Sequence, residues 1–291
     1  MRRSDIEVEG LAATVVEPDR PNGRVVFCFP GGGMSRRYFD LDGTYSMAAH
    51  LAGSGFTVVA VDHPGVGDSP PPAEPWDLTP SYVADRDAGA VAALRTRIGG
   101  TAIGLGHSMG SMLTVVAQAR HRCFDALALL GWAHGEGYRD TALAGHLSPE
   151  ELALVGDPSV PEANIVELAK RRFGRPLPVG STTTSEFLLG GMAVTAEGLE
   201  AIAHARSALL AVCGLASMLK LVGPDVAALD VPVLVGVGER DITVDVRQTA
   251  PSLAACPDIT LYVLPGAGHN HNIAPNRTAL WERVAVWAEG I

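Results

Sequence analysis

The residues with the clearest capacity for chemistry are Gly106–Gly110, where a serine stands two positions from a glycine on either side. A short apolar run, Thr101–Leu105, precedes them and is typical of a buried strand. Ser111–Ala119 follows, and its Met, Leu, Ala and Gln residues favour a helix. A serine on a sharp strand-to-helix turn is a nucleophile elbow, which lifts the hydroxyl above the sheet at the positive end of the helix dipole. Ser108 is therefore the candidate nucleophile.

Such a serine needs a sheet beneath it, and apolar runs along the chain supply one. An opening hairpin is predicted over Ile6–Glu17, where apolar and polar residues alternate around Gly10. Near-continuous apolar runs fit parallel strands covered on both faces. These runs are Arg24–Phe29, Gly55–Val61, Asp125–Gly131, Val231–Val237 and Ile259–Leu264. The helices predicted between and after them are Gly43–Ala52, Ser81–Ile98, Val246–Ala255 and Pro275–Ala288, the last with Leu280, Val284 and Trp287 on one face. Alternating strands and helices predict a parallel α/β sheet.

A long segment, residues 134–228, interrupts this alternation with helical material and no clear strands. Its candidate helices are Pro149–Leu154, Pro161–Phe173, Ser185–Met192 and Ala196–Val222. Long insertions without their own sheet usually form lids or binding elements. Ala208–Leu219 is strongly apolar, and two interpretations stay open: a face over the active site, or packing of the inserted helices on one another.

Taken together, these features resemble the α/β-hydrolase superfamily over nearly the whole chain. The elbow, a glycine-rich loop after the first buried strand, and a late Asp and His follow the family's order. The resemblance implies a mostly parallel α/β-hydrolase sheet flanked by helices, with a helical cap inserted after the sixth strand. It implies a core domain over residues 1–133 and 229–291 and a cap over residues 134–228.

The resemblance also implies a carboxylate that orients the catalytic base. Asp241 lies in Gly238–Asp241, just after a predicted strand, where the family's G-x-x-D loop places its acid. Asp245 and Glu239 are nearby competitors that we interpret as solvated loop charges. Glu136 is a further alternative, because some members carry the acid after the preceding strand.

The expected base is a histidine in a glycine-rich loop after the last strand. His269 in Pro265–Asn272 fits the family's G-x-G-H pattern and would take the proton from Ser108. His271, two residues further on, is the alternative base or a residue of the pocket wall. The other histidines considered are ordinary helix or surface residues: His50, His121, His146 and His204.

Pro30–Met34 matches the family's oxyanion loop, with proline where histidine is usual. The expected oxyanion donors are the N–H groups of Met109 and Gly32. Gly33 and Met34 are alternatives from the same loop and candidate substrate contacts. His107, inside the elbow, is either a third substrate contact or a packing residue beside Ser108. The loop over residues 62–69, Asp-His-Pro-Gly-Val-Gly-Asp-Ser, resembles a family loop that we interpret as scaffold.

Composition narrows the partners and the location. The net charge is −10, and no Lys/Arg cluster suggests a nucleic-acid surface. The first ten residues lack the apolar core of a signal peptide, and no apolar run is long enough to span a bilayer. Four scattered cysteines without metal-ligand spacing are expected to be reduced, buried thiols: Cys28, Cys123, Cys213 and Cys256. We expect a cytoplasmic protein, from a bacterium with a high-GC genome by its Arg, Ala and Gly bias, that uses no metal and no cofactor. The oligomeric state is left open.

The functional hypothesis is a serine hydrolase that cleaves a carboxylic ester or related acyl bond in an apolar small molecule through a covalent acyl-enzyme. The alternative is an acyl-thioesterase of secondary metabolism, because Gly-His-Ser-Met-Gly also occurs in editing-type thioesterases. A non-catalytic or non-hydrolytic protein of the same fold is the third hypothesis. A serine nucleophile argues against the dehalogenase and epoxide hydrolase branches, which use Asp.

Overall fold

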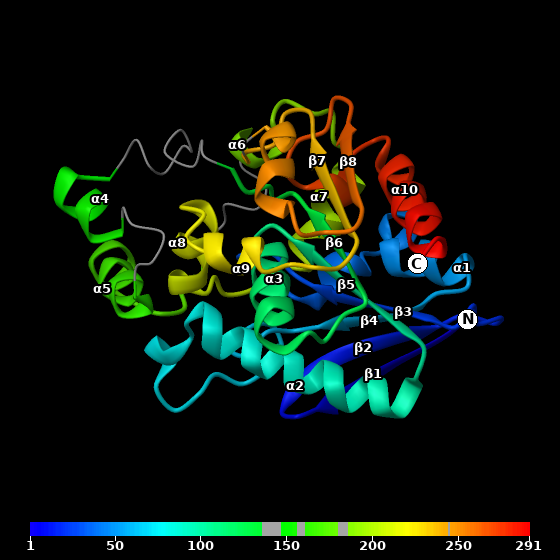
Figure 1. The fold of residues 1–291 in the computed structure, drawn as a ribbon. Coiled ribbons are helices and arrows are strands. Elements are labelled where there is room, and N and C mark those ends of the chain that lie inside the picture. The colour runs from blue at the N-terminus through cyan, green and yellow to red at the C-terminus, as the bar shows by residue number, and fades with distance from the viewer. Residues whose placement is uncertain (136–146, 156–160, 180–185, 244) are drawn as a thin grey trace.

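The computed structural model describes residues 1–135, 147–155, 161–179, 186–243 and 245–291. In these residues the strands form one eight-stranded sheet in the order β1-β2-β4-β3-β5-β6-β7-β8 (Figure 1). β1 pairs antiparallel with β2 and β2 with β4, and the other neighbours run parallel. The strands are β1 Arg2–Val8, β2 Leu11–Glu17, β3 Arg24–Phe29, β4 Thr57–Val61, β5 Thr101–His107, β6 Ala126–Leu130, β7 Val233–Gly238 and β8 Ile259–Leu264. The predicted α/β sheet is confirmed.

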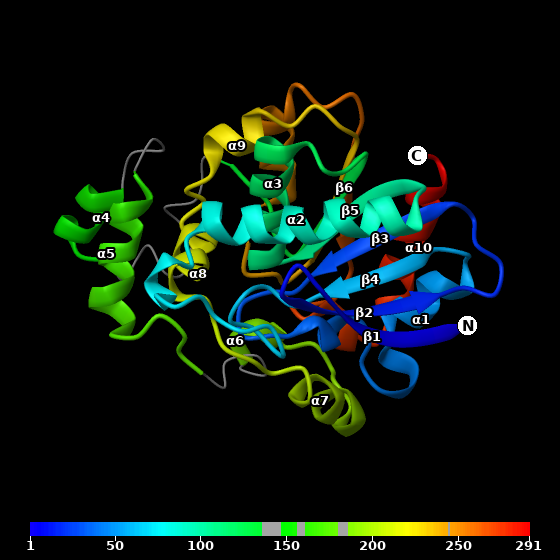
Figure 2. The ribbon, with the colours of Figure 1, turned by 90° about the horizontal axis from the view of Figure 1, so that it is seen from below.

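Two apolar cores, one on each face of the sheet, explain why the strands read as continuous apolar runs. In β3, Val25 and Phe27 belong to one core, while Val26 and Cys28 belong to the other. Helices α2 and α3 cover the first core, and α1 and α10 cover the second; Figure 2 shows the two pairs on opposite sides of the sheet. Their bounds are α1 Met47–Gly53, α2 Pro80–Ile98, α3 Met109–His121 and α10 Arg277–Glu289. A strand buried on both faces needs apolar residues at every position.

The predicted insertion after the sixth strand is confirmed as a set of helices between β6 and β7. Among them, α4 and α5 lie farthest from the sheet in Figure 1. α8 packs against α2, α3 and α5, and α9 packs against α3. The helices are α4 Pro149–Val155, α5 Glu162–Phe173, α6 Glu186–Leu189, α7 Ala196–Ala203, α8 Ala211–Met218 and α9 Gly223–Ala227. The domain boundaries at 134 and 228 stay a prediction.

Two predicted helices are wrong in form. The segment Val246–Ala255 contains two short 3-10 turns, Val246–Gln248 and Ala250–Leu253, in place of an α-helix. Pro251 accounts for the break, because its nitrogen cannot donate to a preceding turn. The segment Ala196–Val222 is interrupted between α7 and α8, where the backbone leaves the helix to pair with a loop of the core.

The loop after β4 is held by a buried ion pair, in agreement with its interpretation as scaffold. The Asp62 side chain is fully buried and accepts hydrogen bonds from the backbone N–H of Arg36, at 2.6 Å, and of Asp68, at 3.0 Å. It also forms an ion pair with the Arg36 guanidinium. Gly67 packs so closely that a Cβ there would lie 2.2 Å from the Asp62 carboxylate. This position therefore requires glycine.

Replacing Asp62 with alanine should lower the free energy of unfolding by about 3–5 kcal/mol, because Arg36 stays buried without its main partner. Urea denaturation monitored by circular dichroism measures the change. The matched control is Asp85→Ala, which removes an exposed carboxylate from Arg120 and should cost no more than about 1 kcal/mol. Equal losses in the two variants would contradict a structural role for the buried pair.

Candidate active site

Ser108 occupies the turn between β5 and α3 in a strained backbone conformation, with φ 55° and ψ −120°. Non-glycine residues rarely adopt a positive φ, and such residues gather at functional sites. The flanking glycines are required by close packing: a Cβ would lie 2.3 Å from Ser111 at Gly106 and 2.2 Å from the Phe29 carbonyl oxygen at Gly110. The Ser108 N–H donates to the carbonyl of Leu130 at 2.7 Å. The Ser108 side chain stays partly exposed above the sheet.

Asp241 and His269 meet beyond the carboxyl ends of β7 and β8. Oδ1 of Asp241 lies 2.7 Å from Nδ1 of His269, and the two side chains are 2% and 6% exposed. Burial alone would raise the pKa of Asp241, but the charges and hydrogen bonds of His269 and His271 outweigh it and hold that pKa well below its ordinary value. When a neutral ring donates from Nδ1–H to such a carboxylate, its proton is on Nδ1 and its Nε2 is the free acceptor that a general base requires.

His107, the residue before Ser108, contacts His269 through its ring. Nε2 of His107 lies 2.9 Å from the carbonyl oxygen of His269, and the centroids of the two rings are 4.8 Å apart. Among the described residues, no hydrogen bond joins the Ser108 hydroxyl to the His269 ring. Hydrogen bonds between nucleophile and base are often long without substrate and tighten when it binds.

The glycine-rich loop after β3 lies directly against the elbow. A Cβ on Gly31 would lie 2.9 Å from the His107 ring and 3.0 Å from Ser108 Cβ. Gly32 is half-buried, and its N–H donates to no acceptor within the described part of the chain. The N–H of Met34, by contrast, donates to the carbonyl of Gly31 at 3.2 Å. Of the loop N–H groups considered, that of Gly32 is thus better placed than that of Met34 to meet a substrate.

Met109 has a backbone N–H free to donate, whereas the expected substrate contacts are buried. Met109 is the first residue of α3, so its N–H has no carbonyl partner in its own helix. Gly33, Met34 and His107 are all buried. The His107 ring stacks on Tyr38 with centroids 4.4 Å apart, and burial together with the charges of neighbouring histidines holds its pKa well below the ordinary value. This arrangement favours packing beside Ser108 over contact with a ligand.

The insertion touches the glycine-rich loop and the loop that carries His269. Its segment 205–209 runs along the glycine-rich loop, where the carbonyl of Ala205 accepts from Ser35 at 2.7 Å and the N–H of Ser207 donates to Gly33 at 2.8 Å. The Leu209 side chain packs on Gly32, where a Cβ would lie 2.5 Å from its Cδ1. At the other loop, the N–H of His269 donates to the carbonyl of Leu188 at 2.9 Å. Residues of the insertion therefore border the site on two sides.

Sequence reasoning did not anticipate the buried amine of Lys220. Its Nζ donates to Thr243 Oγ1 at 3.1 Å and lies 4.8 Å from the centroid of the Trp132 ring. Burial lowers the pKa of Lys220 to about 7, although the charge of Asp241 acts against this. The amine joins the insertion to the loop that carries Asp241. Nothing in the apolar run around Lys220 distinguishes it from a lysine whose head reaches solvent.

A second buried pair supports the glycine-rich loop from beneath. Nδ1 of His63 lies 2.6 Å from Asp87, and its Nε2 lies 3.1 Å from the carbonyl oxygen of Pro30. Both ring nitrogens of His63 therefore face hydrogen-bond acceptors. Burial disfavours a charged ring, but Asp87 raises the pKa of His63 above its ordinary value.

The comparisons with known proteins agree with this geometry. Residues 25–279 match the family model described as "Alpha/beta hydrolase family". This chain belongs to the alpha/beta hydrolase family. Among solved structures, this α/β hydrolase is similar to a thermostable carboxyl esterase from Bacillus coagulans, with 18% identity, a TM-score of 0.67, and coverage of 100% of this chain and 98% of the other. The search of curated proteins finds no match.

Two further solved structures share the fold of this α/β hydrolase. A monoacylglycerol lipase from Paleococcus ferrophilus has 17% identity and a TM-score of 0.64, with coverage of 96% of this chain and 98% of the other. An N-acyl homoserine lactonase complexed with N-butanoyl homoserine has 18% identity and a TM-score of 0.56, with coverage of 100% and 96%. At these identities the likeness shows the fold alone.

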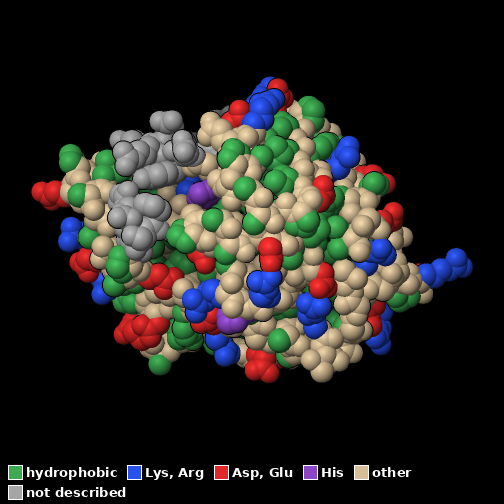
Figure 3. Space-filling view, viewed as in Figure 1, with side chains coloured by type: hydrophobic (Ala, Val, Ile, Leu, Met, Phe, Trp, Pro, Cys, Tyr) green, Lys and Arg blue, Asp and Glu red, His purple; other side chains and the backbone are tan. Residues whose placement is uncertain are grey.

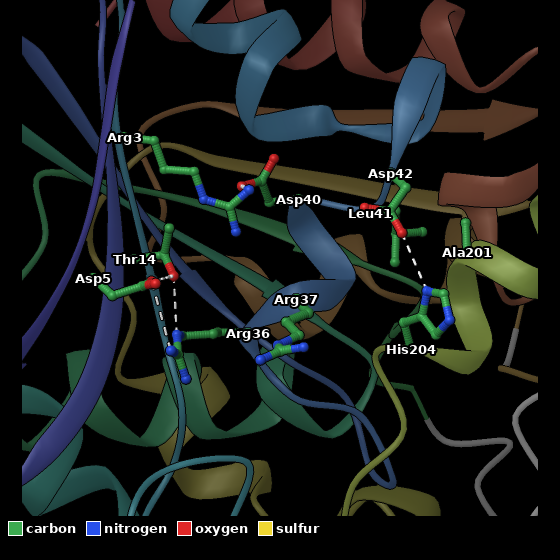
Figure 4. A pocket seen from close by; sticks show the side chains of 10 residues that line it. All are labelled: Arg3, Asp5, Thr14, Arg36, Arg37, Asp40, Leu41, Asp42, Ala201 and His204. Carbon is green, nitrogen blue, oxygen red and sulfur yellow. Dashed lines mark hydrogen bonds and ion pairs between the residues drawn. The ribbon is translucent and has the colours of Figure 1, made fainter.

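Two pockets of this α/β hydrolase lie away from the nucleophile elbow. One, of about 250 Å³, is lined by charged residues such as Arg3, Arg36 and Asp40, several of them paired with one another (Figure 4). The other, of about 560 Å³, reaches Asp241 from the side of Thr243 and Val246. Within the described ranges, no group of three or more His, Cys, Asp or Glu side chains is arranged to hold a metal ion.

Other features bear on partners. Lys and Arg side chains are interspersed with Asp and Glu on the face drawn in Figure 3. No described helix combines the length and apolar character that crossing a membrane requires.

The four cysteines carry free thiols, of which Cys28, Cys123 and Cys213 are buried and Cys256 is half-buried. The expected acid Asp241 is described, whereas its alternative Glu136 lies outside the described residues.

Proposed function

We propose that the protein hydrolyses carboxylic esters or related acyl bonds, with Ser108 as nucleophile, His269 as general base and Asp241 as the carboxylate that orients it. The observation that carries the proposal is the 2.7 Å contact between Asp241 and Nδ1 of His269, at the sheet edge where Ser108 stands in its strained turn. A carboxylate, an imidazole and an elbow serine at one edge are the parts that acyl transfer needs.

In this mechanism Oγ of Ser108 attacks the substrate carbonyl while Nε2 of His269 takes its proton. The carbonyl oxygen becomes an oxyanion, and the N–H groups of Met109 and Gly32 donate to it; each such donor contributes on the order of a few kcal/mol. The imidazolium then gives its proton to the leaving group, and a covalent acyl-Ser108 remains. Water, deprotonated by His269, releases the acid and restores the serine. These steps require no metal and no cofactor.

The insertion over residues 134–228 serves in this proposal as a cap that contributes an apolar wall. Leu209 packs on Gly32, the proposed oxyanion donor, so apolar surface from the insertion borders the position where an acyl group would lie. Burial of additional CH₂ groups against such a surface favours binding by about 0.8 kcal/mol each. A small molecule with an apolar acyl chain is therefore the proposed substrate.

The test is a matched series of p-nitrophenyl esters from acetyl to decanoyl, with the acyl-thioester of one chain length beside its oxygen ester. We expect kcat/KM to rise from acetyl to medium chains by on the order of tenfold or more. A flat series would contradict the apolar wall. A thioester preferred over its oxygen ester would move the assignment to a thioesterase. Purified, folded protein that cleaves no member of either series would contradict acyl hydrolysis.

A further inference from the structure

The proposed triad acid has a second histidine on its other side. Oδ2 of Asp241 lies 2.9 Å from Nε2 of His271, while Oδ1 faces His269. The side chains of Asp241 and His271 are 2% and 1% exposed, so water does not compete for this contact. A triad needs only one histidine, and the contact to His271 is therefore an additional feature of this chain.

The protons around Asp241 can be assigned from the chemistry of the partners. Ionised carboxylate oxygens only accept, so Nε2 of His271 must carry the hydrogen that points to Oδ2. The N–H of Gly238 lies 3.2 Å from Oδ2 and 3.1 Å from Nε2 of His271, and with Nε2 protonated it donates to Oδ2. The N–H of Ile242 donates to Oδ1 at 2.7 Å. Each carboxylate oxygen thus accepts one imidazole N–H and one backbone N–H.

The second nitrogen of the His271 ring, Nδ1, is buried and has no hydrogen-bond partner among the described residues. With Nε2 donating to Oδ2, Nδ1 is left as a buried acceptor, and Asp241 is the partner that fixes the ring. The titratable and charged groups that face the pair are His107, with its ring 5.5 Å from that of His271, His269, Tyr38 and Lys220.

We propose that His271 is a positioning residue, which donates its Nε2–H to Oδ2 of Asp241 and thereby aims Oδ1 at His269. The inference rests on the proposed function, because it takes Asp241 as the acid of the triad. With Oδ2 bound to a fixed ring and a backbone N–H, the carboxylate plane cannot rotate away from His269. His271 acts through Asp241 and does not touch the substrate.

The first test reads the tautomer directly by ¹⁵N-edited NMR of the imidazole groups in the wild-type protein. We expect the His271 ring to carry a proton on Nε2, the atom that faces Oδ2 of Asp241. A ring protonated on Nδ1 alone would overturn the proposal. This measurement does not depend on activity and needs no variant.

The second test compares His271→Leu, which removes the donor, with His271→Gln, whose amide can donate from nearly the same position. We expect His271→Leu to lower kcat on the order of 10- to 100-fold, the factor that separates a hydrogen bond to a charged group from none, with KM within about threefold. His271→Gln should recover most of this loss. His204→Gln, at an exposed histidine, is the control and should leave activity unchanged.

The pH profile separates positioning from mere packing. Without the His271 donor, the charge of Asp241 is less neutralised and stabilises the imidazolium of the resting enzyme, so the acidic limb of kcat/KM should move to higher pH in His271→Leu. An unmoved limb with kcat within twofold of wild type would overturn the proposal. If His271→Leu does not fold, His271→Gln and the tautomer measurement decide. The variant Ser108→Ala distinguishes the two proposals. If only the role of His271 is wrong, Ser108→Ala is still inactive; if the proposed function is wrong, Ser108→Ala keeps its activity.

Discussion

Replacing Ser108 with alanine should lower kcat/KM for acyl esters by at least about a thousandfold, because no other group can form the acyl-enzyme. Activity remaining above the uncatalysed rate would come from the oxyanion donors and from substrate binding alone. The fold should persist, since a smaller side chain replaces a partly exposed hydroxyl that no described residue binds. Steady-state kinetics on several esters and a circular dichroism spectrum measure both expectations.

Ser111→Ala is the matched control for the elbow. Ser111 lies three residues further along, and its buried hydroxyl donates to the carbonyl of Leu130 at 3.0 Å. Its removal should reduce stability but keep activity within about tenfold, the effect of one lost neutral hydrogen bond. A fluorophosphonate probe should label wild type and Ser111→Ala and spare Ser108→Ala. Undiminished turnover in Ser108→Ala would exclude the serine nucleophile, and a folded wild type that takes no label would favour a binding protein.

The elbow and the sheet could be predicted because their signals are local. Glycines at 106 and 110 are required by contacts within the same strand, turn and neighbouring strand. The sequence therefore shows a glycine two residues before and two residues after Ser108. The parallel strands are likewise visible as apolar runs, since both faces are buried. The pairing of Asp241 with His269 was expected from the family resemblance, which assigns an acid and a base to the loops after β7 and β8.

Contacts between distant side chains carry no such local signal. The interruption between α7 and α8 arises because residues 205–207 pair with residues 33–35, at least 170 positions earlier, and this pairing overrides a helical composition. The ring of His271 and the amine of Lys220 both face Asp241 from other elements, and their partners become visible only when the chain is folded. Sequence alone therefore left His271 as either a base or a wall residue.

Replacing Asp241 with asparagine should lower kcat by up to about 10⁴-fold, the loss caused by the equivalent change in a serine protease. In this site the carboxylate accepts hydrogen bonds on both oxygens, from His269 and Ile242 on Oδ1 and from His271 and Gly238 on Oδ2. An amide has an NH₂ group in place of one oxygen. In either orientation, that NH₂ group faces one imidazole N–H and one backbone N–H. The imidazole can move its proton to its other nitrogen, but the backbone N–H cannot.

If the NH₂ group faces His269, that ring accepts at Nδ1 and carries its proton on Nε2, where it can no longer remove a proton from Ser108. If it faces His271, that ring can accept at Nε2 by changing its tautomer, and His269 then donates to a neutral amide oxygen, which stabilises the imidazolium less than a carboxylate does. Asp245→Asn and Glu239→Gln, on the same loop, are the controls and should stay within about threefold of wild type, because surface charges contribute little. An active Asp241→Asn with an inactive Glu136→Gln would transfer the role of the acid to Glu136, and the positioning role of His271 would then have no function to serve.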